Sequence, residues 1–197
     1  MTTEFVLIRH GQTAWNAEGR MQGRSDTVLN ELGLQQAEAL GEAMHGEQWD
    51  VLAASPSKRA WATALPVAAA IGIDEQDMLP DPRLMERDYG IGEGLLFSEL
   101  IERYPNRDWD GQETEDDLTH RAVSALEDYL KRFPNNRIVI VTHGTWINHA
   151  IALLSNGEYG PGISPIMNTS RTYVSHDGDG WHVTNVSDTS HLEALVG

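Results

Sequence analysis

Residues 5–11 read FVLIRHG and decide the fold, because an apolar run passes directly into polar residues. The four apolar side chains are continuous rather than alternating, which is typical of a strand that is buried on both faces. Residues 51–54 and 138–141 form two further runs of this kind. Such strands occur in parallel sheets that are covered on both sides. The three runs therefore predict a mainly parallel central sheet.

Segments with helical periodicity lie between and after these runs. Apolar residues recur at intervals of three and four within 29–44, 60–71, 118–133 and 146–154, a spacing that places them on one face of a helix. Pro66 lies inside the second segment and is expected to kink or shorten that helix. Because strand and helix alternate, the sequence predicts a single α/β domain over the whole chain, with helices flanking the sheet in three layers.

Two segments depart from this alternation. Residues 80–112 are rich in Pro and Gly, which predicts a long excursion with at most one short helix, at about 95–104. Long ordered excursions often cover active sites. Near the C-terminus, residues 169–175 and 181–187 are separated by HDGDG. This pattern predicts a β-hairpin at the edge of the sheet.

Composition excludes several classes of function. The 197 residues include 14 Lys and Arg against 30 Asp and Glu, a net charge of −16, which argues against nucleic acid or an anionic membrane as partner. The absence of Cys excludes disulfides, thiolate metal sites and cysteine nucleophiles. No segment approaches the roughly 18 apolar residues of a membrane span, and no signal peptide is apparent. These features predict a cytoplasmic protein.

Basic residues follow the three apolar runs. Arg9 and His10 come after the first run, Arg59 after the second and His143 after the third. Because ligands of open α/β sheets bind at the carboxyl ends of the strands, these side chains are expected to converge. In so acidic a chain they favour an anionic ligand, and Arg forks match a phosphoryl group. Helix N-termini after the first run and at Gly144 would add backbone donors.

These residue types also suit phosphoryl transfer. A neutral His10 could attack phosphorus and form a phosphohistidine. Arg9, Arg59 and a protonated His143 would stabilise the charge on the transferred group. The reaction further needs a general acid for the leaving alcohol. Candidates in the excursion are Glu86, Asp88 and Glu93.

Five ordered motifs extend through nearly the whole chain. They lie at 7–33, 55–64, 84–94 and 141–144, followed by Asn168 with His191 and Leu192. In this order they resemble the histidine phosphatase superfamily, the phosphoglycerate mutase-like proteins. The resemblance implies the fold of that superfamily and an activity without metal or other cofactor.

The resemblance also implies a role for each matched residue. His10 would be the nucleophile, Arg9, Arg59 and His143 the phosphate pocket, and Glu86 the acid and base. The substrate side would be lined by Asn16, Gln22 and Gly23. The expected activity is hydrolysis of a small phosphorylated metabolite.

Some features leave alternatives open. The string 86–90 leans towards the mutase branch, whereas 12–13 and 22–23 lean towards the phosphatase branch, and the Arg-rich insertion of mutases is missing. A phosphoglycerate mutase and a catalytically silent phosphoryl binder are therefore alternatives. Gly92 stands where the family often has Trp, which is expected to widen the pocket or loosen the loop. The sequence is compatible with a homodimer through the hairpin edge.

Other residues admit two interpretations. Six of the ten residues in 108–117 are acidic, which predicts a solvated loop and helix start or, as the alternative, a divalent-metal loop of a metal-dependent hydrolase. Trp15 and Trp146 adjoin the motifs, and their side chains could form part of the pocket wall. Four arginines could either extend a cationic pocket mouth or pair with surface carboxylates. They are Arg20, Arg24, Arg83 and Arg87.

Overall fold

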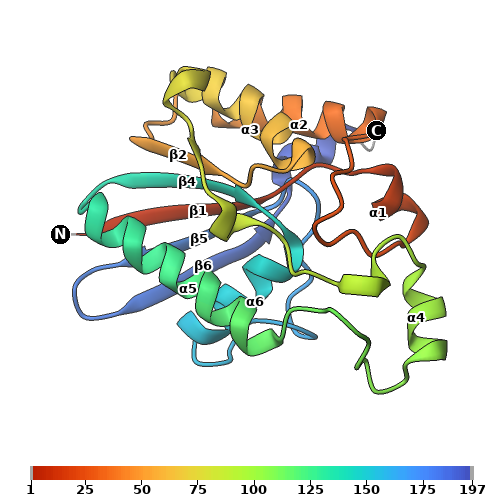
Figure 1. The fold of residues 1–197 in the computed structure, drawn as a ribbon. Helices are drawn as coiled ribbons and strands as arrows, with labels where there is room; N and C mark the ends of the chain where they lie inside the picture. Colours follow the sequence, from red (N-terminus) through yellow and green to blue (C-terminus); the bar gives the residue numbers. More distant parts are fainter. Residues whose placement is uncertain (1, 196–197) are drawn as a thin grey trace.

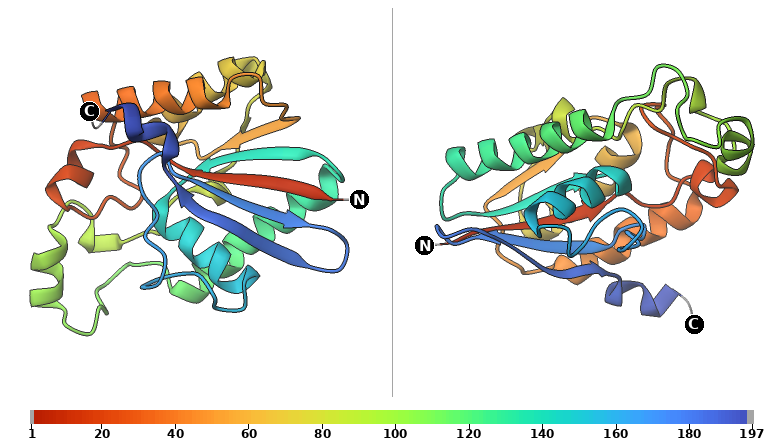
Figure 2. Two further views of the ribbon diagram at one scale, coloured as in Figure 1. Left: turned by 180° about the vertical axis from the view of Figure 1, so that it is seen from behind. Right: turned by 90° about the horizontal axis from the view of Figure 1, so that it is seen from below.

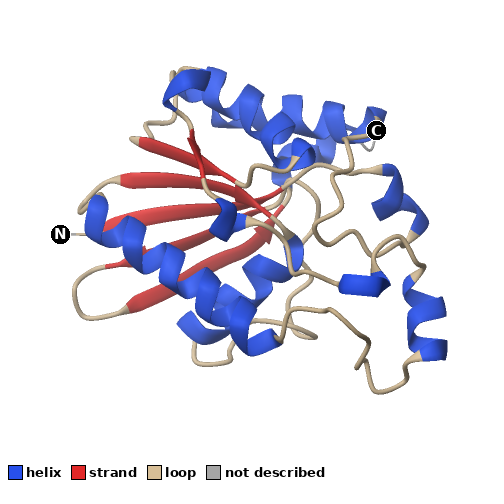
Figure 3. Ribbon diagram, in the orientation of Figure 1, coloured by secondary structure: helices blue, strands red, loops and turns tan. Residues whose placement is uncertain are grey.

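The computed structural model describes residues 2–195 as a six-stranded sheet between two layers of helices (Figures 1 and 3). The strands are β1 (Thr3–Arg9), β2 (Val51–Ala54), β3 (Leu79–Pro80), β4 (Arg137–Thr142), β5 (Arg171–His176) and β6 (Trp181–Asp188). Their order is β3-β2-β4-β1-β5-β6. The first four strands in this order pair in parallel, and β5 and β6 add an antiparallel hairpin at one edge. The predicted mainly parallel sheet and edge hairpin are both confirmed.

Four long helices cover the sheet, two on each face (Figures 1 and 2). The α-helices are α1 (Ala14–Glu18), α2 (Glu31–Met44), α3 (Lys58–Ile71), α4 (Phe97–Arg103), α5 (Glu115–Arg132) and α6 (Gly144–Leu154). Side-chain oxygens of Asn30 and Thr114 cap the starts of α2 and α5. The short α1 and β3, and the 3₁₀-helix Ser190–Leu195, were not predicted.

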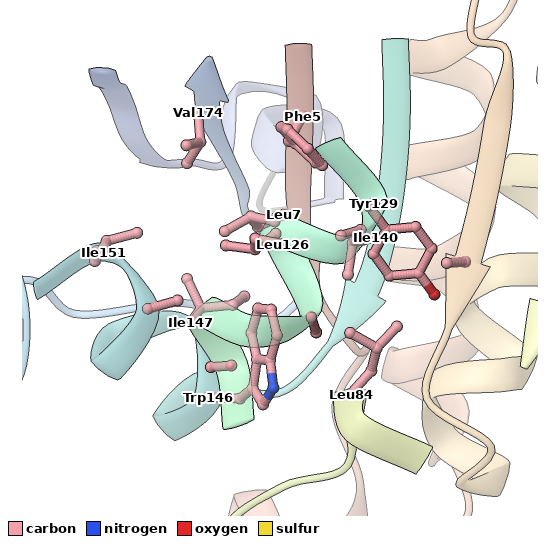
Figure 4. Close-up of a cluster of buried hydrophobic side chains, with 14 of the residues drawn as sticks. Phe5, Leu7, Leu84, Leu126, Tyr129, Ile140, Trp146, Ile147, Ile151 and Val174 are labelled. Carbon is pink, nitrogen blue, oxygen red and sulfur yellow. The ribbon is translucent and has the colours of Figure 1, made fainter. Parts of the chain in front are cut away.

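Alternating side chains of the strands explain the continuous apolar runs. Phe5 and Leu7 of β1 pack with α5 and α6, in a cluster that also contains Trp146 and Tyr129 (Figure 4). Val6 and Ile8 face the opposite way and share a second cluster with α2 and α3. Because successive strand residues point to opposite faces, both faces require apolar side chains. The three-layer prediction follows from this and is confirmed.

The prediction for Pro66 is wrong in one respect. Helix α3 continues through Pro66 to Ile71 and ends at Gly72, which has a left-handed backbone with φ of 77°. Val67 and Ala68, just after the proline, are buried in the cluster with α2. Since most helical stability comes from such packing, the last turns persist although one backbone hydrogen bond is missing.

The segment between β3 and α5 has a small core of its own. It carries one short α-helix, α4, as predicted, and lies beyond the sheet near α1 (Figure 1). Tyr89, Leu100 and Trp109 form the core. A Cβ on Gly92 would lie 2.8 Å from Nε1 of Trp109, and this indole donates to the Tyr89 carbonyl at 2.8 Å. The space beside Gly92 is therefore filled by the Trp109 side chain.

None of the helices within residues 2–195 has the length and apolar character needed to cross a membrane.

Candidate active site

The ends of β1 and β4 bring two histidines together. Arg9 pairs in register with Thr142, so that His10 and His143 follow at the same edge of the sheet. Their rings lie edge to face with centroids 5.1 Å apart. Arg59, in the first turn of α3 after β2, is 1% exposed and contacts both rings. The convergence predicted from the sequence is therefore present.

A cavity of about 290 Å³ opens at this edge. It is lined by eight of the residues that the sequence nominated, namely Arg9, His10, Asn16, Gln22, Gly23, Arg59, Glu86 and Gly144. His143 is not among the lining residues. It is fully buried and reaches the site through its contact with Arg59.

Hydrogen bonds identify which ring nitrogen of His10 is unprotonated. Its Nδ1 lies 2.7 Å from the Gly11 carbonyl, which can only accept, so Nδ1 carries the proton. The lone pair then resides on Nε2, to which Arg59 Nε donates at 3.2 Å. Burial, followed by the charges of Arg59 and Arg9, holds the pKa of His10 well below its ordinary value. The ring is therefore neutral, with its lone pair on Nε2.

His143 is neutral as well. Its Nδ1 accepts a hydrogen bond from Arg59 Nη2 at 3.2 Å, and its Nε2 donates to Ser55 Oγ at 2.9 Å. Burial is the main cause that holds the pKa of His143 well below its usual value, and the Arg59 charge adds to it. The protonated His143 expected from the sequence is therefore wrong for this state of the site, because an uncompensated buried cation beside Arg59 is unfavourable.

Backbone carbonyls orient Arg59. Its Nη1 donates to Ser25 O and its Nη2 to Gly23 O, both at 2.7 Å. The loop that contains these residues thereby fixes the guanidinium group between the two histidines.

Arg9 keeps an unpaired donor. Its Nη1 donates to Ile166 O at 2.6 Å, whereas its Nε is buried without a partner among the described residues. Buried donors are rarely left unpaired, so this atom is suited to an oxygen of a bound anion. A Cβ at Gly144 would lie 3.3 Å from this Nε, which explains why a glycine suits that position.

Glu86 enters the cavity from the excursion. Its Oε1 accepts from Arg87 N and Trp146 N, and its Oε2 accepts from Thr145 N, at 2.9 to 3.1 Å. The carboxylate therefore occupies backbone donors at the start of α6 that were expected to bind phosphate. Glu86 is the candidate acid that lines the cavity, since neither Asp88 nor Glu93 does.

Loop contacts hold the substrate-side residues. Asn16, the third residue of α1, forms a capping box with the N-cap Thr13, in which each side-chain oxygen accepts from the backbone of the other residue. Gln22 Oε1 accepts from the hydroxyls of Thr13 and Thr27. Behind them, Asn168 Nδ2 donates to the His10 carbonyl at 2.9 Å. These bonds keep the polar wall of the cavity in place.

The geometry can be compared with known proteins. Residues 5–189 match the sequence profile of the histidine phosphatase superfamily (branch 1). The chain belongs to the histidine phosphatase superfamily. The resemblance inferred from the five motifs is thereby confirmed, and the protein is a phosphatase.

Two curated relatives of this histidine phosphatase align along nearly its full length. The uncharacterized phosphatase PhoE of Bacillus subtilis is 30% identical, over 98% of this chain and 99% of the relative. The metal-independent phosphoserine phosphatase of Arabidopsis thaliana is 36% identical, over 98% and 84%. Among solved structures, a phosphoserine phosphatase mutant of Entamoeba histolytica in complex with phosphoserine has a TM-score of 0.83 and 28% identity, over 96% and 99% of the two chains.

The arginines around the site of this histidine phosphatase mostly pair with carboxylates. Arg24 approaches Asp88 and Glu113, and Arg87 approaches Glu115. Arg83 pairs with Asp81 and Asp128. Arg20 pairs with Glu18 but also lines the cavity. These carboxylates offset much of the positive charge that the four arginines would otherwise place at the pocket mouth.

Several lining residues of the histidine phosphatase were not predicted. They are Met21, Tyr89, Thr145, Asn148 and Ile166, whereas Trp15 and Trp146 do not line the cavity. Helical spacing from Gly144 was the available signal for Asn148, which lies four residues later and shares its face of α6. The acidic run 108–117 leads into the first turn of α5, and within residues 2–195 no group of three His, Asp or Glu is placed to hold a metal ion.

Proposed function

We propose that this histidine phosphatase hydrolyses small phosphomonoesters through a phosphohistidine at His10, without a metal. The observation that carries the proposal is the neutral His10 ring, which lines the cavity and whose lone-pair nitrogen lies 3.2 Å from Nε of the buried Arg59. Such a ring can attack phosphorus without first losing a proton. Full-length relatives named as phosphatases support this activity.

In the first step, Arg59 Nε gives up its hydrogen bond to His10 Nε2, and the freed lone pair attacks phosphorus while Arg9 and Arg59 stabilise the charge on the phosphoryl oxygens. The bond between phosphorus and the ester oxygen breaks as the bond to nitrogen forms. Protonated Glu86 gives its proton to the leaving oxygen, so that a neutral alcohol departs. His143 acts through Arg59, which it helps to hold beside His10.

In the second step, the Glu86 carboxylate takes a proton from water. The water oxygen attacks phosphorus, the bond between phosphorus and nitrogen breaks, and inorganic phosphate leaves. His10 returns to its neutral form and Glu86 is again protonated. The three backbone amides that hold Glu86 keep it at one place through both steps.

The size of the cavity supports a small substrate. At about 290 Å³ it lies at the lower end of the roughly 300–1,000 Å³ of ligand pockets. The similarity to phosphoserine phosphatases supports a substrate of that size, such as phosphoserine. The mutase alternative is not favoured, because the Arg-rich insertion of mutases is missing.

Three sequence-based expectations remain proposals. The excursion 80–112 would cover the site of a single domain that spans 1–197. The protein is expected to be cytoplasmic. It could form a homodimer through the β6 edge. Crosslinking and sedimentation of the purified protein would measure the oligomeric state.

Release of phosphate from p-nitrophenyl phosphate in EDTA tests the proposed activity. We expect release by the wild type and by the control His45→Ala, whose histidine is exposed, and none by His10→Ala. Acid-labile labelling of the enzyme by phosphate should disappear in the same variant. Activity that is lost in EDTA and restored by a divalent ion, or that survives in His10→Ala, would contradict the mechanism.

A further inference from the structure

Glu93 joins the excursion to the loop that holds Arg59. Its Oε1 accepts from Arg24 N at 2.8 Å and from Tyr89 N at 3.3 Å. Its Oε2 accepts from the backbone N of Ser25 at 2.9 Å and from the Ser25 hydroxyl at 2.6 Å. A single carboxylate thus receives four hydrogen bonds from two segments that lie far apart in the sequence. Charge-assisted bonds of this kind are the strong ones.

The loop that Glu93 holds is the loop that orients the catalytic guanidinium. The carbonyls of Gly23 and Ser25 accept both of the 2.7 Å hydrogen bonds from the terminal nitrogens of Arg59. The same guanidinium donates to His10 Nε2 and His143 Nδ1. A continuous set of hydrogen bonds therefore runs from Glu93 through residues 23–25 to both histidines.

Steric fit shows how closely Glu93 approaches this loop. Gly23 has a left-handed backbone with φ of 53°, and a Cβ at this position would lie 2.1 Å from Glu93 Oε1. Only glycine fits there while Glu93 keeps its place. The contact is thus built into the loop rather than made by a freely moving surface side chain.

We propose that Glu93 is a positioning residue, which sets the orientation of Arg59 through the backbone of residues 23–25. The proposal rests on the proposed function, because it assumes that Arg59 stabilises the transferred phosphoryl group. Replacing the carboxylate by an amide brings an NH₂ group against backbone N–H donors, so the loop must shift. A shift of the guanidinium weakens phosphoryl transfer from every substrate, whatever its leaving group.

Substrates with different leaving groups separate positioning from proton donation. In Glu93→Gln we expect kcat/KM, which ends with the leaving-group-dependent first step, to fall by the same factor for phosphoserine and for p-nitrophenyl phosphate, about tenfold or more. If Glu93 were the general acid, phosphoserine hydrolysis would fall much further than hydrolysis of the aryl ester, whose leaving group needs no proton. The matched control is Glu99→Gln, since Glu99 lies on the same excursion and, among residues 2–195, accepts a hydrogen bond only from Leu96 N at the start of α4. This control should keep wild-type rates.

A second variant tests the route through Arg59. In an Arg59→Lys background we expect Glu93→Gln to have little further effect on kcat, because the guanidinium that it positions is gone. Ser25→Ala, which removes one of the four bonds, should give a smaller loss in the same direction if Glu93→Gln fails to fold. Independent effects in the double variant, or unequal losses for the two substrates, would overturn the proposal. Failure of the proposed function would instead appear as an inactive wild type.

A second inference rests on a different atom of the cavity. Asn148 lines the cavity from α6, one turn after Gly144, and its Oδ1 is buried without a hydrogen-bond partner among the described residues. An unpaired buried acceptor is unfavourable unless a ligand donates to it. Arg9 and Arg59 serve the phosphoryl end, so Asn148 is available for the alcohol half of the substrate. We infer that this half carries a hydroxyl or ammonium group that donates to Asn148.

Two esters that differ by their hydroxyl groups test this inference. For the wild type we expect kcat/KM to be at least tenfold higher for glycerol 3-phosphate than for propyl phosphate. Asn148→Leu should remove this preference, whereas the control His45→Ala should keep it, and p-nitrophenyl phosphate, which has no such donor, measures phosphoryl transfer in each protein. A preference that persists in Asn148→Leu, or that is missing from an active wild type, would refute the role of Asn148. Inactivity of the wild type towards all three esters would count against the proposed function itself.

Discussion

The rings of His10 and His143 lie edge to face, with centroids 5.1 Å apart, and each accepts a hydrogen bond from Arg59. One guanidinium therefore serves two imidazoles. Because a guanidinium can only donate, the nitrogens that face it must both be unprotonated. The site is thus set for a neutral nucleophile before any substrate binds.

The pH dependence of activity follows from this arrangement. Burial and the neighbouring arginines hold the pKa of His10 well below 6.5, so the ring stays unprotonated as the pH falls through 6.5. We expect kcat/KM for p-nitrophenyl phosphate to stay near its maximum there and to decline only at clearly lower pH. A pH profile with an acid limb centred near 6.5 would show that His10 titrates as a solvent-exposed histidine does.

The role of Glu86 predicts a selective loss. Glu86→Gln cannot donate a proton, so hydrolysis of phosphoserine should fall by roughly 10²- to 10⁴-fold. Measured as kcat/KM, which ends with the transfer to His10 and excludes the second step, hydrolysis of p-nitrophenyl phosphate should fall much less, because nitrophenolate leaves without a proton. The control is Asp88→Asn, whose side chain does not line the cavity. Equal losses for both esters in Glu86→Gln would assign the proton transfer elsewhere.

Replacing Gly144 should weaken the binding of substrate and phosphate without lowering the stability of the fold. In Gly144→Ala the new methyl group would lie 3.3 Å from Arg9 Nε and displace the guanidinium that faces the ligand. We expect KM and the inhibition constant of inorganic phosphate to rise about tenfold, whereas the melting temperature stays or increases because alanine favours a helix. Gly180→Ala is the matched control, since a Cβ there meets nothing within 4 Å. Unchanged phosphate affinity in Gly144→Ala would contradict the role of Arg9.

His191 should account for part of the decrease in the free energy of unfolding at acidic pH. Burial, followed by the Arg171 charge, lowers the pKa of His191 to about 4. Between pH 6.5 and 4 the unfolded chain therefore binds more protons at this residue than the folded protein does, and the free energy of unfolding falls as the pH falls. His191→Gln should lose less stability between pH 7 and pH 5 than the wild type, as measured by urea unfolding. Exposed His120→Gln serves as the control, and equal losses in all three proteins would exclude the effect.

The strands and the phosphoryl end of the site could be predicted because both follow from local sequence. Continuous apolar runs specify strands with two covered faces, and the residues after them must meet at one edge. Arg9, His10 and Arg59 were found in this way. The family motifs then distinguished Glu86 from two other carboxylates on the same segment.

Other features depend on contacts between distant segments, which a local pattern does not contain. The neutral state of His143 results from burial and from Arg59, which lies 84 positions away in the sequence. The backbone donors at the start of α6 are occupied by Glu86, although a helix start in isolation favours an anionic ligand. Trp109 fills the space beside Gly92 from a separate turn of the excursion.

The alternation of side chains in β1 limits which mutations this strand can accept. Substitutions among Val, Leu and Ile in this strand leave an apolar side chain on the same face of the sheet, so we expect many of them to be tolerated. Inserting or deleting one codon would exchange the two faces of the strand and also move His10 by one position relative to β4. A library of variants should therefore show β1 as permissive to apolar replacement and intolerant of any change in length.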